Sequence, residues 1–165
     1  MPRSSRWFLL AVVVLVLDYA TKMAVLRTFA PGESLALAPF FNLVLVFNKG
    51  AAFSFLATAQ GWQTLFFAAI AVVASAVISF LILKNETKPL FCAALALILG
   101  GALGNLYDRI AYGHVVDFLD FHAAGWHFPA FNVADSAITV GAGILILESF
   151  LQRPANEKAA GDNKP

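Results

Sequence analysis

Four long apolar stretches, separated by more polar segments, dominate the pattern of this chain. They cover residues 7–29, 62–83, 90–107 and 133–151. A helix needs ~20 mostly apolar residues to cross a bilayer, and each stretch is close to that length. The pattern therefore predicts a mainly α membrane protein, with four transmembrane helices in a single integral membrane domain that spans residues 1–165. Residues 152–165 are polar and are expected to form a disordered tail.

A different pattern fills the two segments at residues 30–61 and 108–131. The run FFNLVLVFN, residues 40–48, is rich in β-branched and aromatic residues, as strands are, and Asn48-Lys49-Gly50 follows it as a turn. The second segment contains HVVDFLDF at residues 114–121, followed by aromatic residues around Trp126 that suit a membrane interface. Together the two segments predict a small β-sheet that rests on one end of the helices.

Composition supports the membrane class and indicates an orientation. Hydrophobic residues make up 60% of the chain and charged residues 13%, and a net charge of +1 gives no reason to expect a nucleic-acid partner. Cytoplasmic loops carry an excess of Lys and Arg, which favours cytoplasmic N- and C-termini, an extracytoplasmic sheet and a cytoplasmic tail. The cytoplasmic side then holds Arg3, Arg6, Lys84, Lys88, Arg153, Lys158 and Lys164, and the outer half holds Lys22, Arg27, Lys49 and Arg109.

The first apolar stretch has an alternative interpretation as a cleaved signal peptide, because Arg3 and Arg6 precede its apolar core. No clean A-x-A cleavage site follows Leu17, however, and apolar residues resume at positions 23–26. We therefore expect this stretch to be retained as the first span.

The sequence gives little indication of a metal site or of functional cysteine chemistry. Cys92 is the only cysteine and lies within an apolar run, so neither a disulfide framework nor a thiolate metal cage is expected. There is no H-E-x-x-H motif, and His114, His122 and His127 lack a standard ligand spacing, so we expect them to be solvated or interfacial. No metal ion and no organic cofactor are predicted.

Two groups of polar residues lie within or beside the apolar stretches. Asp18 and Lys22 are four residues apart on one helix face, and a charge in a span costs roughly 2.5–3.5 kcal/mol, which favours a structural ion pair that also holds a site together. Asn105 and Arg109 share a face beside Asp108 at the end of the third stretch. They are either a polar helix end or donors for a substrate's carbonyl groups, and the spacing leaves both open. The glycines at positions 100, 101 and 104 would let a helix or a substrate backbone approach closely.

Acidic residues in apolar surroundings are the main candidates for chemistry. Asp117 and Asp120 lie in HVVDFLDF, and Asp135 lies in the first turn of the fourth stretch, where Asn132 is the expected helix cap. Two acids brought together share one proton, as in an aspartic protease, where one carboxylate activates water and the other polarises the scissile carbonyl. In a strand Asp117 and Asp120 point to opposite faces, so at most one faces a given site. The spacing alone does not choose between them.

Two other chemistries compete with the acid pair. A Ser–Lys dyad would need Ser54 or Ser136 with Lys22 or Lys49, and Lys49 lies in an exposed turn. A proton-coupled transporter would also place acids in a helix bundle, but it needs protonatable groups along a path to both faces. Here the acids gather at one end and the centres of the spans are apolar.

Four sequence blocks, in this order, resemble lipoprotein signal peptidase (signal peptidase II), a family of bacterial inner-membrane aspartic proteases. They are DYATK at 18–22, FNKGAAFS at 47–54, GGALGNLYDRIAYGHVVDFLDF at 100–121 and FNVADSAI at 131–138, and the resemblance covers about residues 7–151. It implies a four-helix membrane core, an outer β-sheet cradle and a small outer helical segment. Tyr19 stands where the family usually has glutamine.

The resemblance also implies a reaction and a set of residues. The family removes the signal peptide from prolipoproteins whose lipobox cysteine carries a diacylglyceryl group, cutting just before that cysteine at the outer face of the inner membrane. Its catalytic aspartates match Asp117 and Asp135, which leaves Asp120 as a solvent-facing or structural acid, and globomycin-type antibiotics and membrane lipid are expected partners. The positions that match the family's other site residues are Asp18, Lys22, Asn48, Gly50, Asn105, Asp108, Arg109, Asn132 and Ala134.

Overall fold

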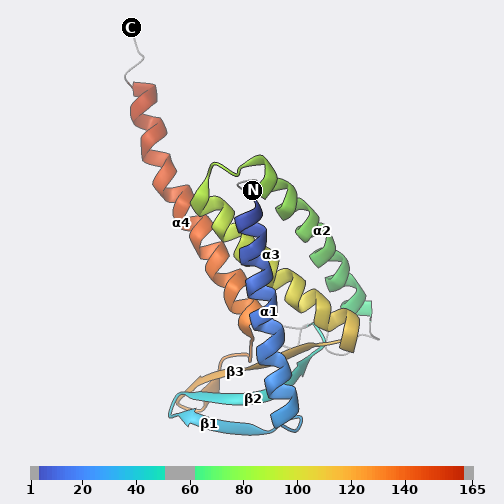
Figure 1. Ribbon diagram of the computed structural model, residues 1–165. Coiled ribbons are helices and arrows are strands. Elements are labelled where there is room, and N and C mark those ends of the chain that lie inside the picture. Colours follow the sequence, from blue (N-terminus) through green and yellow to red (C-terminus); the bar gives the residue numbers. More distant parts are fainter. Residues whose placement is uncertain (1–3, 51–61, 162–165) are drawn as a thin grey trace.

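The computed structural model describes residues 4–50 and 62–161 and contains four helices and four strands within them. The helices are α1 (Ser5–Thr28), α2 (Trp62–Lys84), α3 (Pro89–Tyr112) and α4 (Val133–Gly161). The strands are β1 (Ser34–Ala38), β2 (Phe41–Asn48), β3 (Val115–Ala123) and β4 (Trp126–His127). Figure 1 shows the helices side by side, with the sheet across one end of them.

All four helices are long and apolar enough to cross a membrane, which confirms the predicted mainly helical membrane fold. Two helix ends differ from the predicted boundaries. Helix α3 continues to Tyr112, where Gly113 ends it with a left-handed backbone (φ 76°), so Asp108 and Arg109 lie on the helix itself. The apolar part of α4 ends at Leu151, but the helix continues to Gly161, into the segment that the sequence predicts to be disordered.

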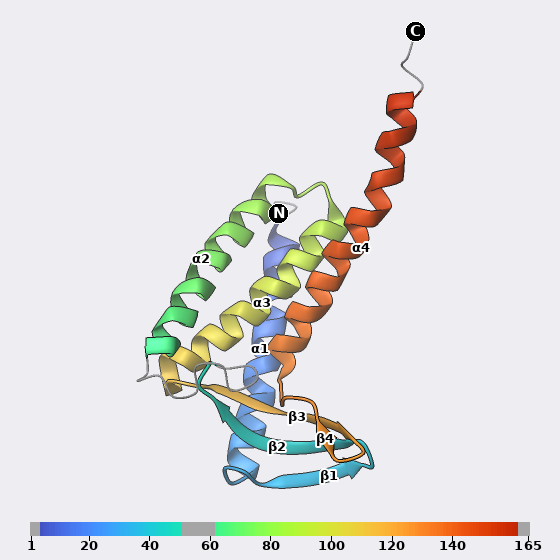
Figure 2. The ribbon, with the colours of Figure 1, turned by 180° about the vertical axis from the view of Figure 1, so that it is seen from behind.

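Helix α3 lies at the centre of the bundle and packs against the other three helices (Figure 2). Its glycines make this packing close. A Cβ at Gly100 would lie 2.6 Å from the carbonyl oxygen of Ala11 in α1, and one at Gly101 would collide with the carbonyl oxygen of Ala134 in α4. These glycines therefore serve the approach of neighbouring helices, one of the two roles that the sequence left open.

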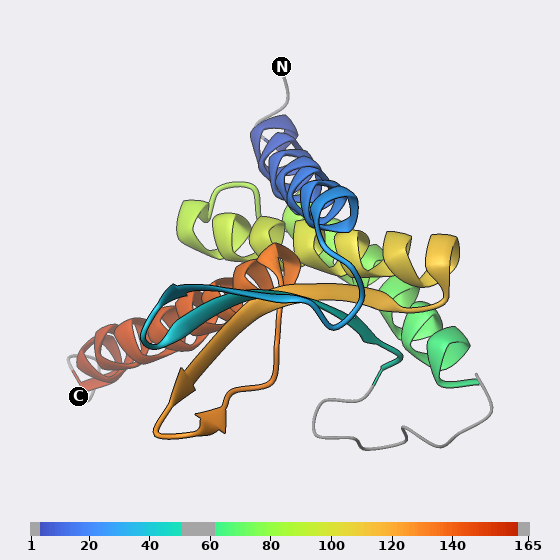
Figure 3. The same ribbon diagram turned by 90° about the horizontal axis from the view of Figure 1, so that it is seen from below.

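The sheet is antiparallel and has the strand order β1-β2-β3-β4 (Figure 3). The register between β2 and β3 pairs Leu43 with Leu119 and then Val46 with Asp117, so it shifts at an irregularity between them. On its other side β3 pairs with Phe131 through the bridge Leu119–Phe131, immediately before α4 begins. Strand β3 therefore links β2 to the start of α4.

A small apolar core fixes the sheet to the helices. Val25 of α1 is buried together with Leu45 of β2 and with Val116 and Phe118 of β3. Both the start of α1 and the far end of α4 lie at the end of the bundle opposite the sheet (Figure 1). Within residues 4–50 and 62–161 no further helix is found, so the implied outer helical segment is not among these residues, and residues 51–61 lie outside the described part of the chain.

Candidate active site

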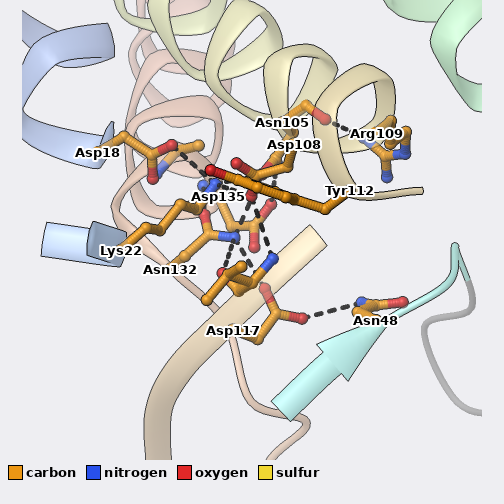
Figure 4. Close-up of polar contacts among 12 residues, drawn as sticks. Asp18, Lys22, Asn48, Asn105, Asp108, Arg109, Tyr112, Asp117, Asn132 and Asp135 are labelled. Atoms are coloured by element: carbon orange, nitrogen blue, oxygen red, sulfur yellow. Dashed lines mark hydrogen bonds and ion pairs between the residues drawn. The ribbon is translucent and has the colours of Figure 1, made fainter. Parts of the chain in front are cut away.

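Polar side chains from five elements meet where the sheet contacts the helices (Figure 4). Asp18 and Lys22 come from α1, Asn105 and Asp108 from α3, Asp135 from α4, Asn48 from β2 and Asp117 from β3, and Asn132 immediately precedes α4. Most of these side chains are buried in a protein whose helices face lipid. Buried polar groups need partners, and the contacts below supply them.

Asp117 lies in β3 and is only 2% exposed. Its carboxyl oxygens accept hydrogen bonds from the side-chain amide of Asn48, at 3.0 Å, and from that of Asn132, at 2.7 Å. Burial, together with the nearby charge of Asp135, raises the pKa of Asp117 to about 7, although the two amide hydrogen bonds oppose the rise. Asp117 can therefore hold a proton near neutral pH.

Asp135 is placed by the first turn of α4. The side-chain oxygen of Asn132 accepts a hydrogen bond from the backbone N–H of Asp135 at 2.9 Å, so Asn132 is the helix cap that the sequence predicts. The amide of Asn105 in α3 donates to the Asp135 carboxylate at 2.7 Å. This carboxylate is therefore held by a neutral donor, at the helix end that favours negative charge.

Two buried asparagines join the acids to each other. Besides contacting Asp117, the Asn132 amide donates to the side-chain oxygen of Asn105 at 3.2 Å and to the carbonyl of Val116 at 3.2 Å. Asn105 in turn contacts Asp135. Asp117 and Asp135 thus belong to one hydrogen-bonded network, and their charges interact. An acid pair that shares a proton can supply both a general base and a general acid.

A buried ion-pair network lies beside the acid pair. The Lys22 ammonium is 2.7 Å from carboxylate oxygens of both Asp18 and Asp108, and it is 3.1 Å from the side-chain oxygen of Asn105. The predicted Asp18–Lys22 pair is therefore present and extends to α3. Because both of its nearest partners are carboxylates, this ammonium is poorly placed to act as the base of a Ser–Lys dyad.

The same carboxylates also hold the backbone near the acids. Asp18 accepts a hydrogen bond from the N–H of Ala134 at 2.9 Å, and Asp108 accepts one from the N–H of Val116 at 3.1 Å. Asp18 therefore fixes Ala134, which precedes Asp135. Asp108 likewise fixes Val116, which precedes Asp117. Two serines are candidates for a Ser–Lys dyad. Ser136 donates a hydrogen bond to the carbonyl of Asn132 at 2.9 Å, and Ser54 lies outside the described residues.

Arg109 and Gly50 lie at the side of the site that α2 approaches. The Arg109 guanidinium donates to the carbonyl of Asn105 at 3.2 Å and lies 5.4 Å from the centre of the Phe67 ring. Gly50 has a positive φ of 114° and donates its N–H to Asn48 at 2.9 Å, and a Cβ there would meet the Phe67 ring at 2.7 Å. The space beside Gly50 is therefore occupied by the Phe67 ring.

Asp120, the other acid of β3, has different partners. Its carboxylate accepts from the Asn42 amide at 2.8 Å and contacts the Nδ1 of His127 at 2.9 Å. It is 7% exposed, so the expectation that it faces solvent is wrong, and the alternative of a structural role fits these contacts. Burial raises the pKa of Asp120, but the hydrogen bonds from Asn42 and His127 and the charge of the histidine outweigh it, and the net pKa is lowered.

Sequence reasoning misses this second group. It gives Asn42 no role. It correctly expects His127 to be solvated, since 55% of the side chain is exposed, but it does not predict the contact with Asp120. The partnership depends on the pairing of β2 with β3 and of β3 with β4, which the spacing of these residues does not reveal. Within residues 4–50 and 62–161, no three His, Cys, Asp or Glu side chains are placed to hold a metal ion.

The fold and the site define a multi-pass membrane protein with a buried acid pair at one end of its helices. Residues 10–151 match the family model described as signal peptidase (SPase) II. The chain therefore belongs to the signal peptidase II family, as its sequence motifs predict. It is a peptidase that cleaves signal peptides from prolipoproteins.

Individual relatives agree with this assignment. Proteins named lipoprotein signal peptidase from Paraburkholderia phymatum and Burkholderia multivorans are each 58% identical over 144 residues, which is 87% of this chain and 87% of each relative. A solved structure described as a bacterial membrane enzyme, determined in meso at 2.3 Å resolution, superposes with a TM-score of 0.80 at 32% identity. The superposition covers 92% of this chain and 91% of that one.

Proposed function

We propose that Asp117 and Asp135 are the catalytic pair of this signal peptidase. The observation that carries the proposal is that Asp117, raised in pKa to about 7 by burial and by the charge of Asp135, belongs to the same hydrogen-bonded network as Asp135. Asn105 and Asn132 offer neutral donors to the two carboxyl groups. In this proposal Asp117, which can hold a proton near neutral pH, is the acid and Asp135 is the base.

The reaction follows from these two roles. Asp135 removes a proton from a water molecule, whose oxygen adds to the scissile carbonyl carbon, while Asp117 transfers its proton to the carbonyl oxygen. The tetrahedral intermediate collapses when Asp135 gives its proton to the departing amide nitrogen and Asp117 takes a proton back from a hydroxyl of the intermediate. The peptide bond is then hydrolysed, and the pair is returned to its starting state.

The substrate in this proposal is a prolipoprotein whose lipobox cysteine carries a diacylglyceryl group, and cleavage occurs before that cysteine. The position of the acid pair at the ends of apolar helices supports it, because a lipid-modified chain remains in the bilayer there. Asn48, Asn105 and Asn132 orient the acids, and Asp18, Lys22 and Asp108 hold the backbone that carries them. Arg109, Gly50 and Ala134 lie around the same site, where globomycin-type inhibitors and membrane lipid would also bind.

The proposed location is the bacterial inner membrane, with both termini in the cytoplasm and the acid pair at the outer face. Arg6, Lys84 and Lys88 lie at the end of the helices opposite the sheet, where the positive-inside rule favours the cytoplasm. The sheet end would then face outward, where water and the processed lipoprotein meet.

Processing of a lipidated prolipoprotein by purified protein tests the catalytic assignment. Asp117→Asn and Asp135→Asn should each abolish cleavage while leaving the helical circular dichroism unchanged. Asp120→Asn is the matched control, because it makes the same chemical change in the same strand, and it should retain substantial activity. Cleavage at the parental rate by either of the first two variants would overturn the assignment.

A further inference from the structure

Two asparagine–aspartate contacts connect β2 with β3, one on each side of the irregularity in their register. Asn42 lies directly opposite Asp120 and donates to it at 2.8 Å, and Asn48 donates to Asp117 at 3.0 Å. Between these contacts the register shifts between Leu43 and Val46. A shift of one residue in strand pairing turns every side chain to the other face, so the register decides which acid of β3 faces Asp135.

Asp120 is held from two strands at once. Asn42 donates from β2, and the Nδ1 of His127 in β4 lies 2.9 and 3.0 Å from the two carboxylate oxygens. The ring of His122, directly opposite His127 in the β3–β4 pairing, stacks on the His127 ring with centroids 4.9 Å apart. A carboxylate with donors on both sides resists sliding of β3 in either direction.

If β3 slid along β2, the acid pair would be displaced directly. Asp117 is three residues before Asp120 on the same strand, and its other donor, Asn132, follows Phe131, which pairs with Leu119 of β3. The backbone N–H groups of Phe118 and Leu119 both donate to the carbonyl of Phe131, at 3.0 and 2.8 Å. The strand thus carries Asp117 and also fixes the segment that leads to Asp135.

We infer that Asp120, held by Asn42 and His127, is a positioning residue that fixes the register of β3 on β2 and so places the Asp117 carboxyl opposite Asp135. This inference rests on the proposed catalytic role of Asp117. Asp120 makes no contact with substrate in this account. It acts only through the strand.

Truncation and conservative replacement of Asp120 distinguish a positioning role from a purely structural one. Asp120→Ala removes both contacts and should lower kcat about ten- to a hundredfold, as small misplacements of reacting groups do, while KM stays within about twofold. The apparent pKa of the kcat profile should also move, because the distance between the two acids changes. Asp120→Asn keeps an oxygen acceptor for Asn42 and an amide for His127, and should restore most of the activity.

Two further variants keep the test decisive. Asn42→Ala removes one contact only, so it should give a smaller fall in kcat of the same kind even where Asp120→Ala does not fold. Glu33→Ala is the matched control: it deletes an acid in the turn before β1 whose carboxylate accepts a local hydrogen bond from the N–H of Ala30, at 2.7 Å, and it should leave kcat and the pH profile unchanged.

The outcomes distinguish the two proposals. If Asp117→Asn is inactive while Asp120→Ala and Asn42→Ala keep the parental kcat and pH profile, the catalytic assignment stands and the positioning role is wrong. A lower thermal stability with an unchanged kcat and pH profile would equally overturn it, because that result marks a purely structural residue. If Asp117→Asn cleaves at the parental rate, both proposals fall.

Discussion

At the scale of single residues, two acids three positions apart in one strand have opposite electrostatic environments. Asp117 and Asp120 are 2% and 7% exposed, so burial disfavours the charge of each. Asp117 also experiences the charge of Asp135, and its pKa rises to about 7. Asp120 has Asn42 and His127 as donors, which outweigh burial and lower its pKa. The difference in partners thus separates an acid that can donate a proton from one that stays ionised.

The raised pKa of Asp117 predicts how stability depends on pH. The folded protein keeps a proton up to about pH 7 that the unfolded chain releases near 3.8, so stability should fall as the pH rises through this window. Asp117→Asn removes this contribution, and its apparent melting temperature in detergent should fall less steeply over the same range than that of the parent.

Asp120→Asn provides the comparison for this measurement. Because the folded pKa of Asp120 is lowered, its contribution to stability is present above the unfolded value of 3.8 and is lost only as the pH falls below it. Asp120→Asn should therefore leave the fall of the apparent melting temperature toward pH 7 as steep as it is in the parent. Equal slopes for the parent and Asp117→Asn would show that Asp117 titrates at its ordinary value.

Much of the site at this scale could be predicted from the sequence, but its connections could not. The Asp18–Lys22 pair follows from helix spacing, and the Asn132 cap follows from its place before an apolar stretch. The contact of Lys22 with Asp108 and that of Asn105 with Asp135 join helices that are distant in sequence. Local spacing carries no information on which helix faces are opposed, so these contacts appear only in the folded chain.

At the scale of elements, the acid pair depends on how closely α4 approaches α3. Gly101 of α3 lies directly against the backbone carbonyl of Ala134, in the first turn of the helix that carries Asp135. Gly104 lies next to the Asp18 carboxylate, and a Cβ at this glycine would be 2.5 Å from one of the carboxylate oxygens. Close helix contact and the position of Asp135 are therefore set by the same glycines.

Adding one methyl group at Gly101 should separate these helices. The new Cβ of Gly101→Ala would collide with a backbone atom that cannot rotate away, so overpacking should cost about 1–3 kcal/mol and lower both the melting temperature and the cleavage rate. Gly143→Ala in α4 is the control, since apart from its chain neighbours and its own helical backbone a Cβ there would meet no atom of the described residues within 4 Å. Similar melting temperatures and cleavage rates for the two variants would contradict the proposed role of close packing.

The sequence predicts the elements better than their ends. Hydrophobic runs locate all four spans, but α3 continues past residue 107 to Tyr112 because the polar residues near Asp108 are still helical and find buried partners. Strand β2 follows from its β-branched run, whereas β1 and the two-residue β4 carry too weak a pattern to be expected. Their formation depends on pairing with β2 and β3.

At the scale of the whole molecule, the helices and the sheet have different roles. The helices provide the apolar surface that holds the protein in a bilayer, and the sheet lies across one end of them (Figure 1). There β3 brings Asp117 to the start of α4. A lipid-anchored substrate and water can meet at such an end. The start of α1 and the end of α4 lie at the opposite end of the bundle, as expected for four spans.

The proposed orientation can be tested by labelling in intact bacterial cells whose outer membrane has been made permeable. A membrane-impermeant maleimide should react with Glu33→Cys, at an exposed position in the turn before β1, and not with Thr87→Cys, in the exposed loop before α3. Cys92 is buried and should not react in either case. The reverse labelling pattern would place the sheet in the cytoplasm.

The central claim is that Asp117 and Asp135 together cleave the prolipoprotein. The most direct measurement is the single-turnover rate of cleavage by purified Asp117→Asn and Asp135→Asn, compared with the parent and with Asp120→Asn. Loss of a general acid or base should lower the rate by at least about 10²-fold in both variants, with circular dichroism like that of the parent. A parental rate in either variant, with that variant folded, would contradict the account.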